Sequence, residues 1–195
     1  NTHSTRIFLD VGIELNENEQ IDIPKIEGLF CGKKDCDAVF ISHYHGDHIG
    51  LLEYILPNVP VYMGEAAYKI FSASANYRNI EIKCSPIFIR HNERITIGNI
   101  RLTPYACDHS AYDSYMFLIE ADEKKVLYTG DFRANGRLDY NELLEEIPEV
   151  DAVIIEGTSL SREETRANIR EEELEDIAVN FLNNYSGPTF VMMSA

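Results

Sequence analysis

Four side chains of the types that bind metal ions lie within six consecutive positions: His43, His45, Asp47 and His48. They follow the apolar run at 38–41, which is typical of a buried strand. In an extended segment His43 and His45 point to the same side, so their imidazoles can converge on one ion. The glycine after His45 lets the chain bend and brings Asp47 and His48 next to that pair. Imidazole with carboxylate suits zinc or another divalent ion of the first transition row.

Two more residues of the same kind occupy comparable positions later in the chain. His109 follows one strand-like segment and Asp131 follows another. Alone, a histidine is ordinarily a surface or packed residue, and an aspartate after a glycine is ordinarily part of a turn. Packing alone is a poor explanation for four such residues in six positions. His109 and Asp131 share with His43 a position at the end of a strand. We therefore predict one metal site containing all six residues, with His3 and His91 outside it.

Strand-like and helical segments alternate along the chain and define the elements that position this site. We predict strands at 6–12, 37–42 and 59–63, helices at 50–56 and 64–75, five neighbouring strands between 87 and 128, and a buried strand at 151–156. Gly98-Asn99 predicts a tight turn between two of the neighbouring strands. This succession favours an α/β fold of two sheets packed face to face with helices outside.

The last part of the sequence has a different pattern. The segment 161–164 has the form of a capping box, and apolar residues at helical spacing over 174–182 predict a long amphipathic helix. The apolar run at 189–195 predicts one further strand. Because the chain begins with Asn1 and stops at this run, we expect both ends to have been cut.

The composition limits the possible partners. The formal net charge of -16 argues against non-specific nucleic-acid binding through surface charge alone, although bound divalent cations would reverse the local field. The four cysteines lack C-x-x-C spacing, which predicts reduced thiols and a cytoplasmic location. No apolar run approaches the length of a membrane span, so we expect no membrane partner.

Four motifs together resemble those of the metallo-β-lactamase fold superfamily. The matches, in chain order, are an aspartate ending an early strand, the H-x-H-x-D-H signature, a single histidine and a bridging aspartate: Asp10; His43, His45, Asp47 and His48; His109; and Asp131. The resemblance implies an αββα sandwich, with two packed mixed sheets and outer helices. It also implies two divalent ions, zinc in the first place, with manganese or iron(II) as alternatives.

The same resemblance implies a role for each matched residue. His43, His45 and His109 would hold one ion, Asp47 and His48 would hold the second, and Asp131 would bridge them. Asp10 would orient the loop that carries the cluster, although a turn aspartate before Gly12 explains it nearly as well.

No histidine follows His109, although hydrolases of this superfamily supply one more on a later strand. The strand at 151–156 instead ends in Glu156-Gly157-Thr158, which resembles the first special motif of the β-CASP nucleases, including ribonuclease J. The segment from His109 to Ser114 resembles the H-S-x-x-D-S run of the same branch. Residues 1–158 would then be part of a metallo-β-lactamase-like catalytic domain, and 159–195 would begin an inserted β-CASP domain. The last ligand and a general-acid histidine would lie beyond Ala195.

The resemblance implies hydrolysis of RNA phosphodiester bonds by a hydroxide shared between two metals, with Asp47, Asp131 and Glu156 as the acidic catalytic residues. Single-stranded DNA is an alternative substrate, and a homodimer of the full-length protein is a further expectation. The negative net charge favours a different enzyme of the same fold that splits a small thioester, lactone or amide. A third interpretation is metal or partner binding without catalysis, against which the complete ligand set argues.

Overall fold

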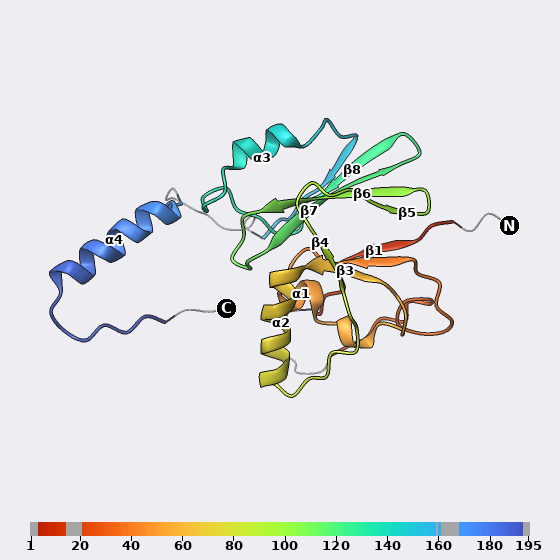
Figure 1. The fold of residues 1–195 in the computed structure, drawn as a ribbon, viewed down its shortest axis with the longest axis horizontal. Coiled ribbons are helices and arrows are strands. Elements are labelled where there is room, and N and C mark those ends of the chain that lie inside the picture. The colour runs from red at the N-terminus through yellow and green to blue at the C-terminus, as the bar shows by residue number, and fades with distance from the viewer. Residues whose placement is uncertain (1–3, 15–20, 159, 161–167, 193–195) are drawn as a thin grey trace.

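The computed structural model describes residues 4–14, 21–158, 160 and 168–192. Two sheets pack face to face, and the helices before residue 150 lie on their outer faces (Figure 1). This is the αββα sandwich predicted above. The architecture does not test the expected start of an inserted domain, which stays a prediction.

The first sheet has the strand order β1-β2-β3-β4 and is parallel throughout. Its strands are β1 (Ile7–Leu9), β2 (Ala38–Phe40), β3 (Val61–Gly64) and β4 (Ile87–Ile89). Its crossovers contain α1 (Gly46–Ile49), the 3₁₀ turn η1 (Leu52–Tyr54) and α2 (Glu65–Tyr77). We expected a mixed sheet, but each successive strand returns through a crossover and therefore runs parallel to its neighbour.

The second sheet has the order β5-β6-β7-β8-β9 and is mixed. Its strands are β5 (Ile95–Ile97), β6 (Ile100–Cys107), β7 (Ser114–Ala121), β8 (Lys124–Tyr128) and β9 (Ala152–Ile154), and α3 (Tyr140–Glu146) precedes β9. Strands β5 to β8 are antiparallel, and β9 is parallel to β8. The tight turn predicted at Gly98-Asn99 is confirmed, since Ile97 pairs with Ile100 and Gly98 has a φ of 57°.

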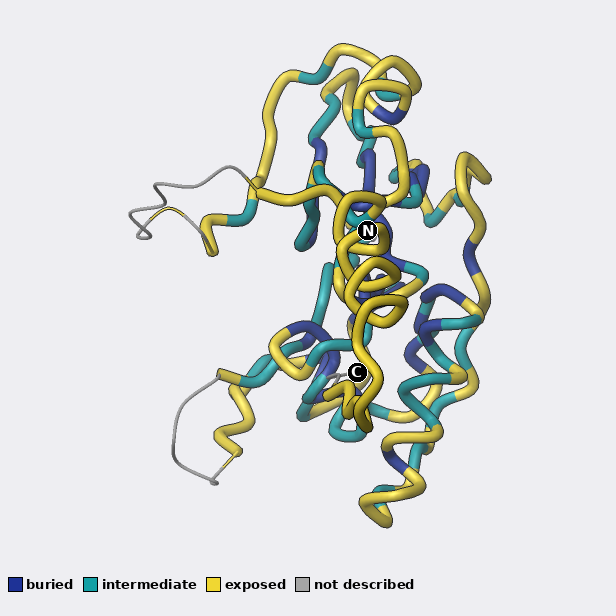
Figure 2. The backbone as a smooth tube through the Cα atoms, turned by 90° about the vertical axis from the view of Figure 1, so that its left-hand side faces the viewer, coloured by how far each residue is buried: buried dark blue, intermediate teal, exposed yellow. Residues whose placement is uncertain are grey.

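The core consists of apolar layers between the sheets and beneath the helices, as the buried backbone in Figure 2 shows. Strand β2 contributes to two of them: Ala38 and Phe40 face the second sheet, where the rings of Phe40 and Phe117 meet edge to face at 5.8 Å. Val39 faces the layer covered by α1 and α2. A strand buried on both faces has a continuous apolar sequence, which explains the run at 38–41. Leu143 of α3 closes the outer layer of the second sheet.

Four predicted elements differ from those observed. The five strands predicted as neighbours between 87 and 128 do not share one sheet, because α2 returns the chain beside β3 and β4 joins the first sheet. Of the helix predicted at 50–56, the structure has only the 3₁₀ turn η1, which follows the short helix α1. The strand expected to be buried, β9, is exposed, since none of its residues belongs to the apolar layers of the core. Residues 187–192 contain no strand, whereas 161–164 and 193–195 lie outside the described residues.

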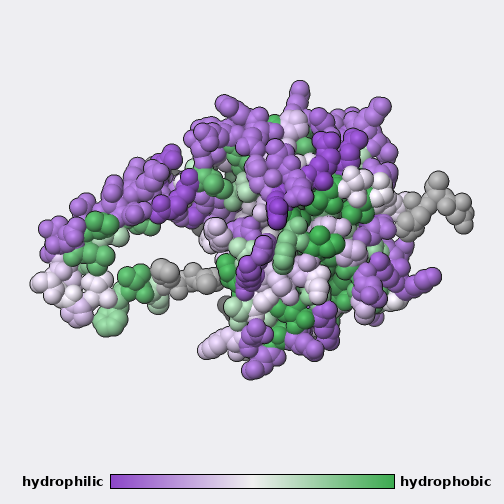
Figure 3. Space-filling model, viewed as in Figure 1, coloured by the Kyte–Doolittle hydropathy of each residue, from purple (hydrophilic) through white to green (hydrophobic). Residues whose placement is uncertain are grey.

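The amphipathic helix predicted near the end is present as α4 (Glu171–Asn184), but it begins at Glu171 without a side-chain cap rather than at the capping box, which lies outside the described residues. It projects from the sandwich in Figure 1, and Figure 2 shows it exposed along its length. None of its residues is buried. Figure 3 shows hydrophilic side chains on its outer side and hydrophobic ones on the side of the C-terminal segment. Among the described helices, none has the length and apolar character needed to cross a bilayer.

Candidate metal centre

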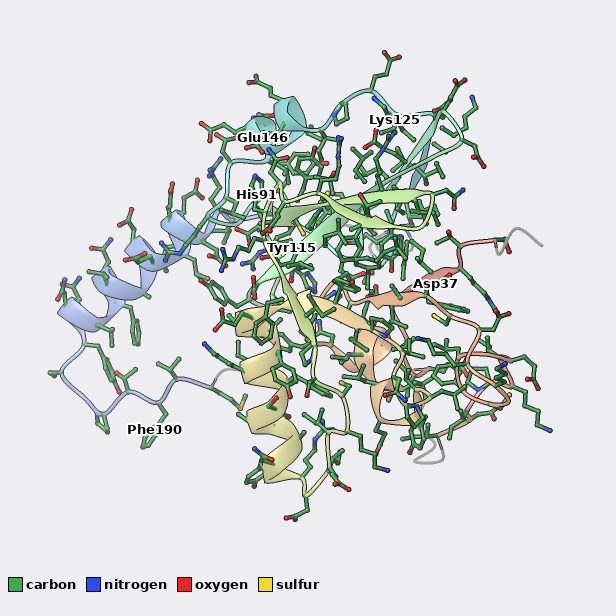
Figure 4. All side chains as sticks on the ribbon, turned by 45° about the vertical axis from the view of Figure 1, so that its right-hand side comes forward. Asp37, His91, Tyr115, Lys125, Glu146 and Phe190 are labelled. Atoms are coloured by element: carbon green, nitrogen blue, oxygen red, sulfur yellow. The ribbon has the colours of Figure 1, made fainter. Side chains whose placement is uncertain are left out.

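The predicted site residues lie where four strands end at one edge of the sandwich. Asp10 follows β1, the histidine cluster follows β2, His109 follows β6 and Asp131 follows β8. Two hydrogen bonds join the sheets here: Tyr115 N donates to Ser42 O at 3.0 Å, and the Tyr128 hydroxyl donates to Asp10 Oδ2 at 2.6 Å. Figure 4 shows Tyr115 between the two sheets. The packing of the sheets therefore brings residues separated by more than a hundred positions into contact.

Three imidazoles form the first group of possible ligands. His43, His45 and His109 each offer a ring nitrogen, and these atoms all lie within 4.8 Å of one another. Only 3.2 Å separates His45 Nδ1 from His109 Nε2. A set of three histidine nitrogens facing a common point is a recurrent catalytic zinc site.

A second group overlaps the first. His43, His48 and Asp131 offer ligand atoms within 4.8 Å of one another, and 3.3 Å separates His48 Nε2 from Asp131 Oδ1. The other carboxylate oxygen of Asp131 is 3.9 Å from His109 Nε2, so this residue lies between the groups. Asp47 Oδ2 is 3.7 Å from His48 Nε2, on the more exposed side. Within this distance His43 completes the second group and Asp47 lies beside it, next to His48, so the predicted assignment of Asp47 and His48 to the second ion stays a prediction.

The environment of His43 tests whether these residues fit a cation. Its Nδ1 lies 3.0 Å from Ser42 Oγ, while its Nε2 is buried without a hydrogen-bond partner among the described residues. Leaving such an atom unpaired costs about 1–3 kcal/mol, which a bound cation would offset. Burial, together with the charges of the neighbouring histidines, lowers the pKa of His43 to about 2, so the ring is neutral and its lone pair is available. The donor set fits a divalent cation.

Asp10 positions the cluster through four hydrogen bonds. Its Oδ1 accepts from Ser42 N at 2.7 Å, and its Oδ2 accepts from Ser42 Oγ at 2.7 Å and from Tyr128. The same oxygen lies 2.7 Å from His48 Nδ1, which fixes the ring with Nε2 toward Asp131. Metal-binding histidines are commonly oriented in this way by a carboxylate.

The carboxylates around His48 make the local electrostatic field negative. Burial alone would lower the pKa of His48, but its hydrogen bond and charge contact with Asp10, and the charges of Asp131 and Asp47, outweigh burial and raise it. A site that stabilises an imidazolium in this way is also favourable for a divalent cation.

Three residues that support the site were not anticipated from the sequence. Ser42 and Tyr128 donate to Asp10, as described above, and Gly12 allows the loop after β1 to lie against α1. A Cβ at Gly12 would lie 1.6 Å from the Asp47 carbonyl oxygen. The alternation of side chains along β8 was the one available signal for Tyr128, and no sequence pattern indicated the close approach at Gly12.

Glu156 lies beside the ligand groups and belongs to neither. Its Oε1 accepts from Phe132 N at 2.9 Å, and its own backbone N donates to Thr129 Oγ1 at 3.3 Å. It therefore fixes the loop that carries Asp131. Burial raises the pKa of Asp131, and the charge of Glu156 raises it further.

The segment after His109 is also fixed at several points. Asp113 Oδ2 accepts from Ala66 N and Ala67 N at 2.8 and 3.1 Å, which caps the first turn of α2. Ser114 Oγ donates to Ala111 O at 2.6 Å. The aspartate and serine of the H-S-x-x-D-S run thus hold the loop that presents His109.

The two histidines predicted to lie outside the metal site are His91 and His3. His91 Nε2 is 2.7 Å from Glu146 Oε2, and its Nδ1 accepts from Ala106 N at 3.0 Å, so it is bonded rather than merely solvated. Figure 4 shows His91 and Glu146 side by side near α3. His91 belongs to neither ligand group, and His3 lies outside the described residues.

Residues 5–181 match the family described as the Beta-lactamase superfamily domain. The chain belongs to this family. Its members are hydrolases that use divalent metal ions, typically Zn²⁺. The fold and the ligand groups described above agree with that membership.

Two ribonucleases are among the relatives that match part of this chain. The chain is 26% identical over 133 residues to ribonuclease J 1 of Streptococcus pyogenes serotype M3, covering 65% of this chain and 24% of that one. It is 30% identical over 144 residues to ribonuclease J 2 of the same organism, covering 67% and 25%. This chain thus spans about a quarter of the length of these relatives.

A solved structure supports the fold over nearly the whole chain. The crystal structure of a protein of unknown function from Enterococcus faecalis V583 superimposes with a TM-score of 0.77 at 25% identity. The match covers 91% of this chain and 52% of that protein.

Proposed function

We propose that this chain is the metal-binding part of a ribonuclease J-like nuclease that cleaves RNA phosphodiester bonds. The observation that carries the proposal is the pair of overlapping ligand groups, with His43 in both and Asp131 between them. The similarity to ribonucleases J 1 and J 2 supports a nucleic acid as the substrate.

The proposed centre holds two divalent cations. His43, His45 and His109 would hold one, while Asp47 and His48 would hold the other with Asp131 shared. Zn²⁺ suits this mixture of imidazole and carboxylate, with Mn²⁺ or Fe²⁺ as alternatives. When bound, such ions act as Lewis acids toward a phosphoryl group and lower the pKa of water.

The chain's own residues orient this chemistry. Asp10 keeps the His48 ring turned toward Asp131, and Glu156 keeps the Asp131 loop in place through Phe132 N. We therefore assign Asp47 and Asp131 as ligands and Glu156 as a positioning residue. Because a carboxylate that holds a ligand loop acts on metal geometry indirectly, its loss would lower activity more than metal content.

The division of the chain is part of the same proposal. We assign residues 1–158 to the metallo-β-lactamase-like domain and 159–195 to the start of an inserted β-CASP domain. The exposed, projecting position of α4 supports this division. Single-stranded DNA as a second substrate, a homodimer and a cytoplasmic location stay predictions.

A small-molecule hydrolase is the second candidate, and the net charge of -16 favours it because polyanions are repelled by acidic surfaces. The test compares single-stranded RNA, single-stranded DNA, a lactone and a thioester as substrates of the zinc- or manganese-loaded full-length gene product. RNA cleavage that is lost in EDTA and in Asp131→Asn, but not in the surface control Asp151→Asn, supports the nuclease. Turnover of the lactone or thioester without RNA cleavage contradicts it.

A further inference from the structure

Two arginines lie beside the candidate metal centre in an otherwise acidic chain. Arg133 and Arg137 line a cavity of about 520 Å³, which His109 and Ser110 also line. The chain has 17 Lys and Arg against 33 Asp and Glu, so two adjacent guanidinium groups at this place stand out. Guanidinium groups suit phosphate because their planar donors bind two oxygens at once.

Asp108 builds this arrangement. Its Oδ1 accepts from Arg133 Nε at 2.8 Å, and its Oδ2 accepts from Arg137 N and Leu138 N at 2.6 and 2.9 Å. The loop wraps so closely that a Cβ at Gly136 would lie 2.0 Å from the Asp108 carboxylate. Because Asp108 directly precedes His109, the residue that organises the arginines is joined to a proposed metal ligand.

The outer side of both arginines is occupied by carboxylates of α4. Glu171 Oε1 pairs with Arg133 and its Oε2 lies 3.4 Å from Arg137 Nε. Glu175 Oε2 lies 2.7 Å from the other end of the Arg137 guanidinium. A carboxylate that spans two guanidinium groups occupies the position in which a phosphate would bind.

The contacts that keep α4 in this position are polar. Besides the ion pairs, Asn135 Nδ2 donates to Ile169 O at 3.0 Å and Glu171 N donates to Asn135 O at 3.1 Å. No residue of α4 is buried, so the apolar effect contributes little to its attachment. Exposed ion pairs contribute about 0.2–1 kcal/mol each, which a polyanion can overcome.

We propose that Arg133 and Arg137 form a binding site for a phosphate of the substrate next to the metal centre, and that Glu171 and Glu175 of α4 compete for it. The inference rests on the proposed phosphodiester substrate. Displacement of the two carboxylates would release α4 from the sandwich and leave the arginines to hold a phosphate of a single strand in the cavity that His109 also lines.

The test measures binding without catalysis. A fluorescein-labelled single-stranded oligoribonucleotide is titrated with the 195-residue chain in EDTA at low salt, and the dissociation constant is taken from fluorescence anisotropy. The variant Glu171→Gln/Glu175→Gln should bind about three- to tenfold tighter, the range expected from one or two ion pairs. Adding Arg137→Gln to that variant should abolish the gain.

The control removes a carboxylate from a comparable pair far from the site. Asp151 Oδ1 pairs with Lys124 at 2.6 Å, at the opposite end of β8 from Asp131, and Asp151→Asn makes the same change in net charge per residue. Its affinity should stay within about twofold of the unmodified chain, as expected for an exposed pair. Circular dichroism checks that each variant folds.

The proposal is overturned if Glu171→Gln/Glu175→Gln binds no tighter than Asp151→Asn, if its gain survives Arg137→Gln, or if it shows no detectable binding. These results are separate from the proposed function. Cleavage of RNA by the full-length gene product with no effect of the glutamates would remove the arginine site and leave the nuclease. The expected binding pattern without metal-dependent cleavage would leave the arginine site and remove the nuclease.

Discussion

Replacing Asp10 with asparagine should weaken both the fold and the metal centre. The carboxylate is 8% exposed and accepts four hydrogen bonds, three of them at Oδ2. Asparagine keeps one acceptor for Ser42 N but presents an amide donor to His48, Ser42 Oγ and Tyr128. The two hydroxyls can rotate to accept, whereas the charge-assisted bond to His48 is lost. Since hydrogen bonds to charged groups contribute about 1.5–3 kcal/mol, we expect a loss of about 2–4 kcal/mol.

The same substitution should lower metal affinity, because the His48 ring would no longer be held toward Asp131. Losing a carboxylate that orients a ligand histidine typically costs about 10–100-fold in affinity. Urea denaturation of the metal-free chain gives the stability, and competition with a chromophoric zinc chelator gives the affinity. Asp35→Asn, at an aspartate whose side chain is 63% exposed, is the control. An Asp10→Asn protein with the stability and zinc affinity of this control would refute the reasoning.

Four further predictions concern the ligands and the loops beside them. Asp131→Asn should weaken zinc binding at both ligand groups by at least about tenfold, because an amide lacks the charge and second anionic oxygen of a bridge. Glu156→Gln should keep the metal but lower the activity of the full-length protein. Equal metal loss in the two variants, measured by mass spectrometry, would contradict both expectations. Gly12→Ala should destabilise the chain by about 3 kcal/mol or more in urea, because its Cβ would meet the Asp47 carbonyl at 1.6 Å; an unchanged midpoint would show that the loop yields freely. Calorimetric titration with zinc should give one firm and one weak site, because the second group has fewer histidines; two equally tight sites would point to another ligand.

The ligand residues could be found from the sequence because their signal is local. An apolar run followed by histidines and an aspartate within a few positions marks a strand end, and His109 and Asp131 repeat that pattern. Strands that end at one edge of a sandwich bring such residues together whatever the details of packing. The structure places all of them there, with the metal-binding role itself still a prediction.

What the sequence did not reveal depends on contacts between distant segments. The hydrogen bond from Tyr128 to Asp10 joins residues 118 positions apart, and either residue taken alone looks ordinary. The same limit applied to β4 and β9, whose apolar sequences indicate strands but not which sheet they join or what covers them. Periodicity reports a side chain's preference for burial, whereas strand pairing and exposure are set by the whole fold.

The electrostatics of the site favour a bound cation over contacts among the site residues alone. Asp10, Asp47, Asp131 and Glu156 place four carboxylates around His48 and His109, and burial with the charge of Glu156 raises the pKa of Asp131. Because the chain has a net charge of -16, the residues outside the site are themselves net negative and do not offset this concentration of negative charge. Divalent cations would neutralise it and also satisfy the unpaired Nε2 of His43. Under the proposed function, an acidic protein could then receive a phosphodiester, because the attraction would be supplied at the metal centre and at the neighbouring arginines rather than by the surface.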